Sequence, residues 1–335
     1  MTEDELITAI EALCHPELVG GRRATQRVIL GIGDDAALWQ PSRSHRSAIS
    51  TDMLVEGGDF TRDMMSYEDT GWRAMTANLS DLAAMGARPV LATVALGFAQ
   101  TTEPQEILEL YRGIAACAQR YKITIAGGDL SRAPVLTIAI TVVGEVRPSN
   151  VKTRAGGRPG DVLAVTGPLG ASRAGLKVAQ KQLAIPTDLQ EEALQALRRP
   201  QPRVADGKFF AASSNVNALM DISDGLSTDV HRLARASRCG AVIEDVPVAK
   251  SARAVALARN EDPERFVLAG GEDFELLVAI RAMAFSHIAT RYKTRFRRDL
   301  IRIGLLRDDA GVVWNGAPLE RSGWDHFAPE EKFSE

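Results

Sequence analysis

One stretch organises the first half of the chain: Ile123-Thr124-Ile125-Ala126-Gly127-Gly128-Asp129. Its β-branched and apolar residues predict a strand, and the glycine pair predicts a turn at the end of that strand. An acid behind such a turn suits a bound phosphate or metal ion, because glycine lets backbone amides approach a ligand closely. A plain turn with a solvated Asp129 is the simpler interpretation, and this stretch alone favours it.

Carboxylates lie beside glycines or hydroxyls at five further places. These are Gly31-Ile32-Gly33-Asp34-Asp35, Ser50-Thr51-Asp52, Asn78-Leu79-Ser80-Asp81, Asp221-Ile222-Ser223-Asp224-Gly225 and Gly270-Gly271-Glu272-Asp273. Aspartate is seldom buried unless it is paired, and gathered carboxylates repel one another unless cations are present. Hard cations such as Mg²⁺ take oxygen ligands and often bind phosphates. The set therefore indicates an enzyme that handles a metal-bound phosphorylated nucleotide.

The hydrophobic pattern predicts an α/β (α+β) protein of two domains, since 335 residues exceed the usual size of one core. In the first half we expect helices over 5–13, 67–85 and 107–121, and strands over 28–30, 47–50, 90–97, 123–126 and 135–146. The second half shows strands over 161–166, 218–220, 242–243 and 275–280, and a helix over 226–237. Residues 147–160 are rich in Pro and Gly, so the predicted domains are 1–147 and 148–335.

Composition excludes several classes of protein. The net charge is -3, and no long basic run marks a nucleic-acid surface; Arg291–Arg298 is better explained as a solvated face than as an RNA patch. No stretch reaches the ~20 apolar residues that span a bilayer. The N-terminus is acidic, unlike a targeting signal, so we expect a cytoplasmic protein. The three cysteines are scattered and fit neither a disulfide framework nor a zinc site.

The segment Asp221–Gly225 precedes a predicted helix. Ser and Asp are preferred N-cap residues, and helix N-termini also attract phosphate. Because one cap needs only one residue, the segment favours a cap that doubles as a metal and phosphate site. Asp81 lies late in its predicted helix, where the helix dipole repels anions. Asp81 alone leaves a solvent-facing acid and a cation-bound acid equally open.

Asp34-Asp35 and Thr51-Asp52 each follow a predicted short strand. Adjacent strand side chains point to opposite faces, so only one of the two acids Asp34 and Asp35 should face a given site. Ser50 and Thr51 add neutral oxygens, which suit Mg²⁺ or a monovalent cation such as K⁺. The sequence lacks a P-loop and the protein-kinase H-R-D and D-F-G motifs.

Together these motifs resemble the thiamine-monophosphate kinase family. The six acidic motifs occur in the family's order, and Gly323-Trp324-Asp325-His326-Phe327 is similar to its C-terminal end. The resemblance covers the chain from about residue 28 to 328. It implies the two-domain fold shared with aminoimidazole ribonucleotide synthetase, in which the N-terminal sheets of two subunits pair in a homodimer. It also implies that thiamine monophosphate and ATP are the substrates, with thiamine diphosphate as product.

The resemblance also implies roles for individual residues. The implied metal ligands are Asp34, Ser50, Thr51, Asp52, Asp81, Asp129, Asp221 and Asp224. The implied ATP contacts are Gly128, Asp129, Arg154 and Ser223. The implied contacts to thiamine are Glu272 and Trp324, whose flat ring could stack on a thiamine ring. Asp34 is chosen over Asp35 on the resemblance alone.

Asp59 departs from the family pattern. The family usually has a histidine here, in a Val-x-x-x-His-Phe run, whereas this chain reads Val55-Glu56-Gly57-Gly58-Asp59-Phe60. We hypothesise that Asp59 contacts the substrate by pairing with the cationic thiazolium of thiamine, or that it recruits another ion.

The expected mechanism is direct in-line phosphoryl transfer assisted by several Mg²⁺ ions. The acceptor phosphate has a second pKa of about 6, so it is largely ionised near neutral pH and needs no catalytic base. Two alternatives stay open. One is another ATP-using enzyme of the same fold, similar to aminoimidazole ribonucleotide synthetase, and the other is a non-catalytic nucleotide- or metal-binding relative.

Overall fold

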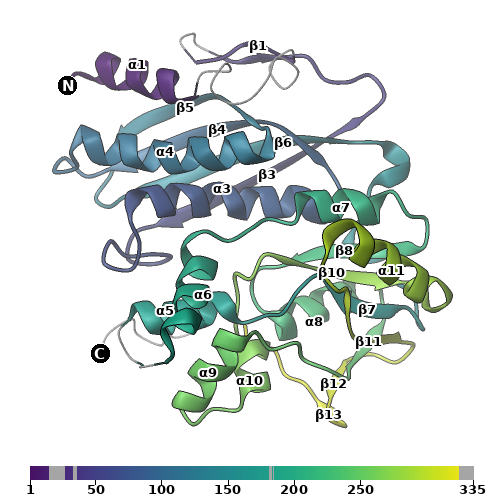
Figure 1. Ribbon diagram of the computed structural model, residues 1–335. Coiled ribbons are helices and arrows are strands. Elements are labelled where there is room, and N and C mark those ends of the chain that lie inside the picture. Colours follow the sequence, from purple (N-terminus) through teal and green to yellow (C-terminus); the bar gives the residue numbers. More distant parts are fainter. Residues whose placement is uncertain (15–26, 33–35, 181–182, 184, 324–335) are drawn as a thin grey trace.

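The computed structural model describes residues 1–14, 27–32, 36–180, 183 and 185–323. Within them, two sheets lie one above the other (Figure 1). The first has the order β3-β6-β4-β5, with bounds Arg46–Val55, Thr137–Val146, Arg88–Phe98 and Thr124–Arg132. The second has the order β13-β12-β9-β11-β7-β10-β8, with bounds Ala317–Pro318, Val312–Trp314, Gly240–Ile243, Ile301–Arg307, Val162–Val165, Glu275–Ile280 and Val216–Ile222. A small hairpin joins β1 to β2, with bounds Val28–Leu30 and Leu38–Trp39.

Helices pack against both sheets. On the N-terminal side they are α1 (Glu3–Cys14), α3 (Tyr67–Ala84) and α4 (Pro104–Tyr121). On the C-terminal side they are α5 (Ala171–Ala179), α6 (Thr187–Arg198), α7 (Val204–Ala211), α8 (Leu226–Ala236), α9 (Lys250–Ala258), α10 (Pro263–Leu268) and α11 (Phe285–Phe296). Short 3₁₀ turns are η1 (Pro148–Asn150), η2 (Arg154–Gly156) and η3 (Ala282–Ala284).

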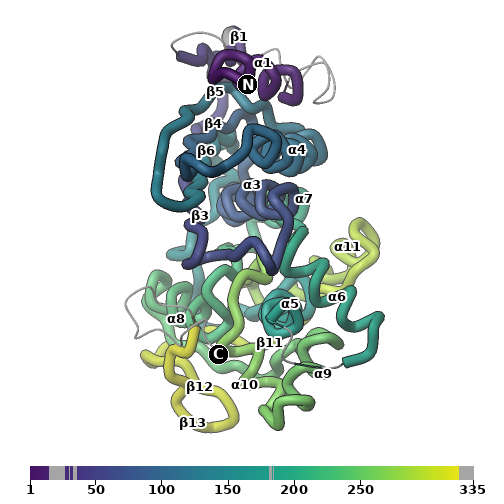
Figure 2. Tube along the Cα trace, turned by 90° about the vertical axis from the view of Figure 1, so that its left-hand side faces the viewer, coloured from purple at the N-terminus to yellow at the C-terminus, as the bar shows by residue number. Residues whose placement is uncertain are grey.

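Helix α3 is the structural centre of the N-terminal half. Its N-terminus is capped by Ser66, whose side chain accepts a hydrogen bond from the Asp69 amide, and Gly86 follows its C-terminus with φ +66°. Glycines let α3 pack directly on α4, because a Cβ at Gly71 would lie 2.1 Å from the Leu110 carbonyl oxygen. Figure 2 shows both helices on one side of the four-stranded sheet, leaving its other face without a helix in the described part of the chain. On that face Ile49 and Met53 are 69% and 58% exposed.

The two halves of the chain share one continuous core, because α3 also packs on the C-terminal side. The Trp72 indole Nε1 donates to the Pro200 carbonyl over 2.9 Å. A Cβ at Gly207 of α7 would lie 1.9 Å from the Ala83 carbonyl oxygen, so only glycine permits this approach. One buried cluster therefore runs from Met75 and Leu79 through Phe210 to Leu276. The domain boundary after residue 147 stays a prediction.

The fold class and the predicted helices at 5–13, 67–85, 107–121 and 226–237 are confirmed. Three expectations about strand ends were wrong. Strand β3 continues to Val55, β5 continues through Gly127–Asp129, and β8 continues to Ile222, so Asp52, Asp129 and Asp221 lie within strands. The physical reason is pairing: Gly128 lies in register with Val94 of β4, and the ladder continues to Arg132.

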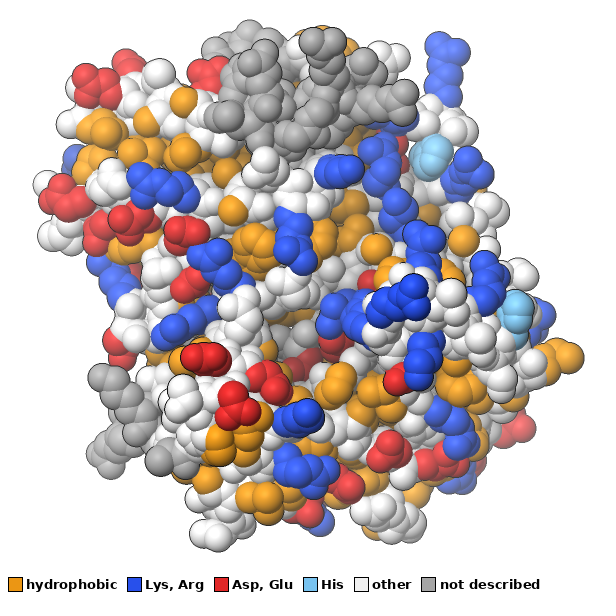
Figure 3. Space-filling view, in the orientation of Figure 1, with side chains coloured by type: hydrophobic (Ala, Val, Ile, Leu, Met, Phe, Trp, Pro, Cys, Tyr) orange, Lys and Arg blue, Asp and Glu red, His pale blue; other side chains and the backbone are white. Residues whose placement is uncertain are grey.

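Other expectations concern the surface. The basic run 291–298 falls mainly on α11, where Arg291, Lys293 and Arg295 are exposed, as a solvated helix face requires. Figure 3 shows basic side chains gathered over this part of the molecule. Each of the three cysteines is buried and free. No described helix has the length and apolar character needed to cross a membrane.

Candidate active site

Acidic side chains from both halves of the chain meet beside α3. Ser50 and Asp52 alternate with exposed residues along β3, so both face the helix side of the sheet. The Ser50 hydroxyl donates to the Asp81 carboxylate, and the Asp52 amide donates to Asn78 Oδ1 over 3.1 Å. On α3 the neighbouring Ser80 donates to Asp221 Oδ2 over 2.8 Å. This last bond connects the N-terminal helix to strand β8.

The acids lie close enough to one another for each charge to affect its neighbours. Burial, together with the charges of Asp81, Asp221 and Asp224, raises the pKa of Asp52 to about 7. Burial and Asp81 raise the pKa of Asp221 to about 6, while Ser80 and the Arg154 guanidinium act in the opposite direction. The raised pKa values of Asp52 and Asp221 show that burial and neighbouring carboxylates outweigh the positive charge near these two acids.

The described residues leave one carboxylate oxygen of Asp221 without a hydrogen bond. Its Oδ1 atom is buried and has no hydrogen-bond partner among the described residues. A buried unpaired carboxylate oxygen costs free energy, and a cation would satisfy it. Among the described residues, no three acidic, His or Cys side chains converge closely enough to enclose a single ion. The donors present are carboxylate and hydroxyl oxygens, and these suit Mg²⁺, which keeps several waters and commonly binds one or two carboxylates together with substrate phosphates.

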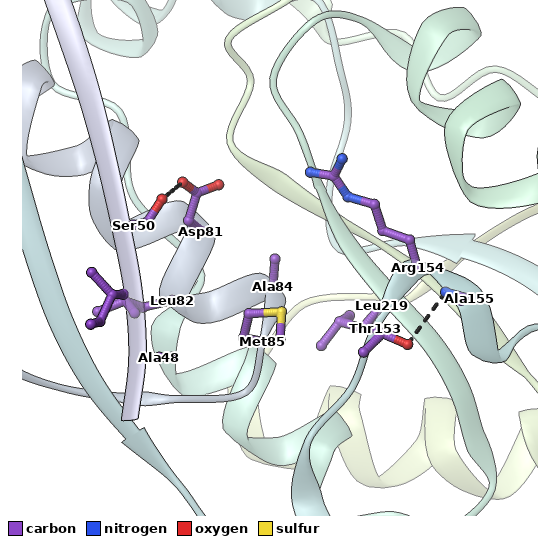
Figure 4. Close-up of a pocket in the computed structure, with 11 residues that line it drawn as sticks. Ala48, Ser50, Asp81, Leu82, Ala84, Met85, Thr153, Arg154, Ala155 and Leu219 are labelled. Carbon is purple, nitrogen blue, oxygen red and sulfur yellow. Dashed lines mark hydrogen bonds between the residues drawn. The ribbon is translucent and has the colours of Figure 1, made fainter. Parts of the chain in front are cut away.

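A cavity of about 490 Å³ opens beside this cluster. Ser50 and Asp81 line it from one side, and Thr153, Arg154 and Leu219 line it from the other. Figure 4 shows the Arg154 guanidinium extended over the space towards the side that carries Asp81. The turn that carries Arg154 is docked on β8, because the Leu219 amide donates to the Thr153 carbonyl over 3.2 Å. A cationic group therefore faces the acids across the cavity, as an anionic ligand would require.

The loop between β8 and α8 is held differently from the sequence prediction. The N-cap of α8 is Gly225, with φ +113° and no side-chain cap bond, so the expectation that Ser or Asp side chains cap this helix was wrong. Instead the buried Asp229 accepts from the Ser223 and Asp224 amides over 3.1 and 3.2 Å. Arg232 pairs with both Asp224 and Asp229. Sequence reasoning missed Asp229, and the only signal was an acid in the first turn of α8.

The two predicted substrate contacts in the described residues have different partners. Glu272 has φ +63°, its amide donates to the Ser223 carbonyl over 2.6 Å, and its carboxylate pairs with Arg73 of α3. Asp59 accepts from the Val55 amide over 2.7 Å and so closes the turn that follows β3. The Glu272 loop is therefore bonded to the loop between β8 and α8, here called the nucleotide loop because it carries Ser223, a predicted ATP contact. One oxygen of Asp59, in contrast, is used by its own turn.

Some of the predicted site residues do not join the cluster. The Thr51 side chain faces away from Ser50 and Asp52 and bonds to Thr141 Oγ1 over 2.8 Å, because side chains alternate along β3. Asp129 and Gly128 lie on β5, at the opposite edge of the sheet from β3. Three interstrand spacings, about 14 Å, separate these edges within one chain. Asp34 and Trp324 lie outside the described residues.

Comparisons with known proteins identify the family. Models of the AIR synthase related protein match at residues 33–146 for the N-terminal domain and 158–281 for the C-terminal domain. The chain is 35% identical over 286 residues to a thiamine-monophosphate kinase of Synechococcus elongatus, an alignment that covers 83% of this chain and 81% of that protein. The chain belongs to the thiamine-monophosphate kinase family. It is therefore an enzyme of the thiamine-phosphate kinase class.

Solved structures of this kinase family share the fold. The crystal structure of thiamine-monophosphate kinase from Stenotrophomonas maltophilia K279a superposes with a TM-score of 0.82 and 31% identity, covering 95% of this chain and 98% of that one. A structure of AaThiL complexed with AMPPCP and TMP superposes with a TM-score of 0.76 and 30% identity, covering 86% and 89%. The two-domain fold expected from the sequence is thereby confirmed.

Proposed function

We propose that this thiamine-monophosphate kinase family member transfers the γ-phosphoryl group of ATP to the phosphate of thiamine monophosphate, giving ADP and thiamine diphosphate. The observation that carries the proposal is the gathering of Asp52, Asp81, Asp221 and Asp224 from both halves of the chain, with Asp81 lining the cavity that Arg154 lines as well. The AaThiL complex with AMPPCP and TMP supports the choice of substrates.

Several Mg²⁺ ions are part of this proposal. The residues that would hold these ions are Ser50, Asp52, Asp81, Asp221 and Asp224. Asp34 is added from the family resemblance. We leave the Thr51 side chain out, because it faces away from these acids. When bound, Mg²⁺ neutralises phosphate charge and holds the reacting phosphates together. The neutral Ser50 oxygen would also suit K⁺.

The chain's own residues then have to bind and orient two anionic substrates. Arg154 lines the cavity and compensates phosphate charge, and Ser223 lies on the adjacent nucleotide loop. Glu272 and Trp324 would contact the thiamine moiety. The acceptor phosphate has a second pKa of about 6 and is largely ionised near neutral pH, so we assign no catalytic base. In-line transfer then depends on positioning and charge compensation.

A homodimer would complete the site. Strands β3 and β5 form the two edges of the N-terminal sheet, and Ile49 and Met53 leave its open face partly apolar. Pairing β3 with β5 of a second copy would set the strand that carries Gly128 and Asp129 in that copy next to the strand that carries Asp52. We therefore keep Gly128 and Asp129 as proposed ATP contacts, and Asp129 as a metal ligand, across the subunit interface.

Asp59 keeps its proposed role as a contact to the cationic thiazolium of thiamine. The contact would use the carboxylate oxygen that does not accept from the Val55 amide. An Asp59→Asn variant with an unchanged KM for thiamine monophosphate would count against this role.

A cytoplasmic location is proposed as well, and the buried free thiols of Cys14, Cys117 and Cys239 suit a reducing compartment.

A coupled assay of ADP release tests the function. The acceptors are thiamine monophosphate, thiamine and the substrate of aminoimidazole ribonucleotide synthetase, each with and without Mg²⁺. We expect turnover only with thiamine monophosphate and Mg²⁺. Turnover with the ribonucleotide would identify the enzyme as similar to aminoimidazole ribonucleotide synthetase. Tight ATP binding without turnover on any acceptor would identify a non-catalytic relative.

A further inference from the structure

Arg73 is a buried arginine whose surroundings call for a functional explanation. It lies in the middle of α3 with 1% of its surface exposed. Its guanidinium pairs with the Glu272 carboxylate and also donates from Nη1 to the Leu197 carbonyl. Its Nε is buried without a hydrogen-bond partner among the described residues. Burying a charged group is costly unless it is paired, so the ion pair with Glu272 is the contact that makes this position tolerable.

The backbone of Glu272 is fixed independently of Arg73. Glu272 and Phe274 both have positive φ angles, +63° and +51°, which are uncommon for residues other than glycine. Hydrogen bonds hold this conformation: the Glu272 amide donates to the Ser223 carbonyl over 2.6 Å, and the Phe274 amide donates to the Ile222 carbonyl over 3.0 Å. A Cβ at Gly271 would lie 2.6 Å from the Ser223 carbonyl oxygen. The loop is thus anchored to the nucleotide loop without help from α3.

The side chain of Glu272 is less constrained than its backbone. It is 43% exposed, and its Oε2 atom contacts Arg73 Nη2. A half-exposed glutamate samples several rotamers unless a partner selects one. Arg73 supplies that selection from the N-terminal domain, while the exposed part of the carboxylate remains open to a ligand.

We infer that Arg73 is a positioning residue for substrate recognition: it orients the Glu272 carboxylate towards the cationic, N–H-donating thiamine moiety. This inference rests on the proposed function. Arg73 itself is buried and does not touch the substrate. Removing it should therefore weaken binding of thiamine monophosphate through Glu272 and leave ATP binding nearly unchanged, because the nucleotide loop keeps its own hydrogen bonds.

A purely structural role for Arg73 makes a different prediction. Arg73, Trp72 and Thr76 all connect α3 to the segment 197–200: Trp72 Nε1 and Thr76 Oγ1 donate to the Pro200 carbonyl over 2.9 and 3.3 Å. If Arg73 were only a clamp between the halves of the chain, losing it would resemble losing one of these bonds. Trp72→Phe is therefore a matched control, because it removes a hydrogen bond from the same helix to the same segment and leaves Glu272 untouched.

The test compares Arg73→Gln, Arg73→Lys, Trp72→Phe, Glu272→Gln and the double variant Arg73→Gln/Glu272→Gln in the full chain. KM is measured separately for thiamine monophosphate and ATP, and thiamine monophosphate binding is measured by calorimetry. We expect Arg73→Gln to raise KM and Kd for thiamine monophosphate about tenfold or more, with KM for ATP changed less than about threefold. Arg73→Lys should recover part of the loss, because its ammonium keeps the charge beside Glu272. In the Glu272→Gln background, Arg73→Gln should have little further effect on thiamine monophosphate binding.

Equal changes in both KM values, or a full effect of Arg73→Gln in the Glu272→Gln background, would overturn the inference. An effect of Trp72→Phe as large and as selective as that of Arg73→Gln would also overturn it. If Arg73→Gln does not fold, the soluble Arg73→Lys and Glu272→Gln variants and their double variant provide the same cycle. Absence of ADP release from the unaltered protein with thiamine monophosphate is a separate result, which would reject the proposed function itself.

Discussion

Ser80 and Asp221 are joined by a buried hydrogen bond of 2.8 Å that connects helix α3 to strand β8. The bond uses only Oδ2, and it leaves the buried Oδ1 without a hydrogen-bond partner among the described residues. The next residue of α3, Asp81, accepts from Ser50 of β3. Hydrogen bonds among α3, β3 and β8 thus bring the Asp81 and Asp221 carboxylates together from both halves of the chain. A bound cation would balance the Asp221 oxygen that has no hydrogen-bond partner.

Asp221→Asn should separate catalysis from folding. Asn keeps an acceptor for Ser80 and removes one charge from the cluster, so we expect Tm without Mg²⁺ not to fall at pH 8. We expect kcat/KM to fall by roughly 100-fold or more, equivalent to about 2.7 kcal/mol of transition-state stabilisation. The rise in Tm that Mg²⁺ gives the unaltered protein should shrink, since binding to the folded state is what stabilises it.

Asp161→Asn is the matched control for Asp221→Asn. Asp161 is also a buried acid, but it accepts from the Arg158 amide and the Asn217 side chain and is fully engaged in the fold. This control should lower Tm and leave the Mg²⁺-induced rise intact. An Asp221→Asn variant with normal kcat/KM would remove this residue from the site.

Gly128 and Gly127 should respond differently to alanine. A Cβ at Gly128 would lie 2.0 Å from the Val94 carbonyl oxygen, whereas a Cβ at Gly127 would have nothing within 4 Å. Overpacking of this kind costs about 1–3 kcal/mol or more, so Gly128→Ala should lower Tm by roughly 5 °C or more. Gly127→Ala should leave Tm almost unchanged. Thermal unfolding followed by circular dichroism provides the comparison, and similar Tm values for both variants would contradict the strand packing described for β5.

Gly128 also shows what the sequence could and could not predict. Helices α3, α4 and α8 follow from local spacing of apolar residues, and their predicted bounds are close to the observed ones. A glycine pair after a strand looks locally like a turn, yet pairing with β4 continues the strand through it. Only the partner strand carries that information, so single-sequence reasoning could not find it.

The residues of the site were also predicted only in part from the sequence. The motifs named Asp52, Asp81, Asp221 and Asp224, and the structure brings these four together. Side chains alternate along β3, so the Thr51 side chain points to the opposite face of the sheet from Ser50 and Asp52. The sequence analysis missed Asp229, Arg73 and Arg232. Arg73 pairs with a residue that is distant in sequence, and Asp229 and Arg232 lie on a helix without a recognisable motif.

The open face of the N-terminal sheet predicts a dimer that one charge can disrupt. Pairing β3 with β5 at both edges of the two sheets would close them around their open faces. Ile49→Asp places a carboxylate on that enclosed face, so size-exclusion chromatography with light scattering should show a monomer. The unaltered protein should show twice the chain mass. Met283→Asp is the control, because Met283 is 92% exposed and lies in η3, which directly follows strand β10 of the other sheet. A dimer that survives Ile49→Asp would place the interface elsewhere.

Asp273 should make stability depend on pH. Burial raises its pKa to about 7, although the Gly170 amide, which donates to the carboxylate over 2.8 Å, acts in the opposite direction. Between pH about 4 and about 7 the folded chain then holds a proton that the unfolded chain has released, so this group's contribution to stability declines as pH rises through that window.

Asp273→Asn removes this titration and keeps an acceptor oxygen for Gly170. Its Tm should therefore fall less between pH 5 and pH 8 than that of the unaltered protein, both measured by calorimetry without Mg²⁺. Parallel Tm curves for the two proteins over this range would show that Asp273 is ionised throughout.

Phosphorus NMR of one reaction mixture tests the proposed chemistry most directly. The unaltered protein is mixed with ATP, thiamine monophosphate and Mg²⁺, and the phosphate signals are followed with time. We predict that the signals of thiamine diphosphate and ADP grow at equal rates while no inorganic phosphate accumulates, and that neither grows without Mg²⁺. Release of inorganic phosphate without thiamine diphosphate, or no change in the ATP signals, would contradict phosphoryl transfer at this acidic site.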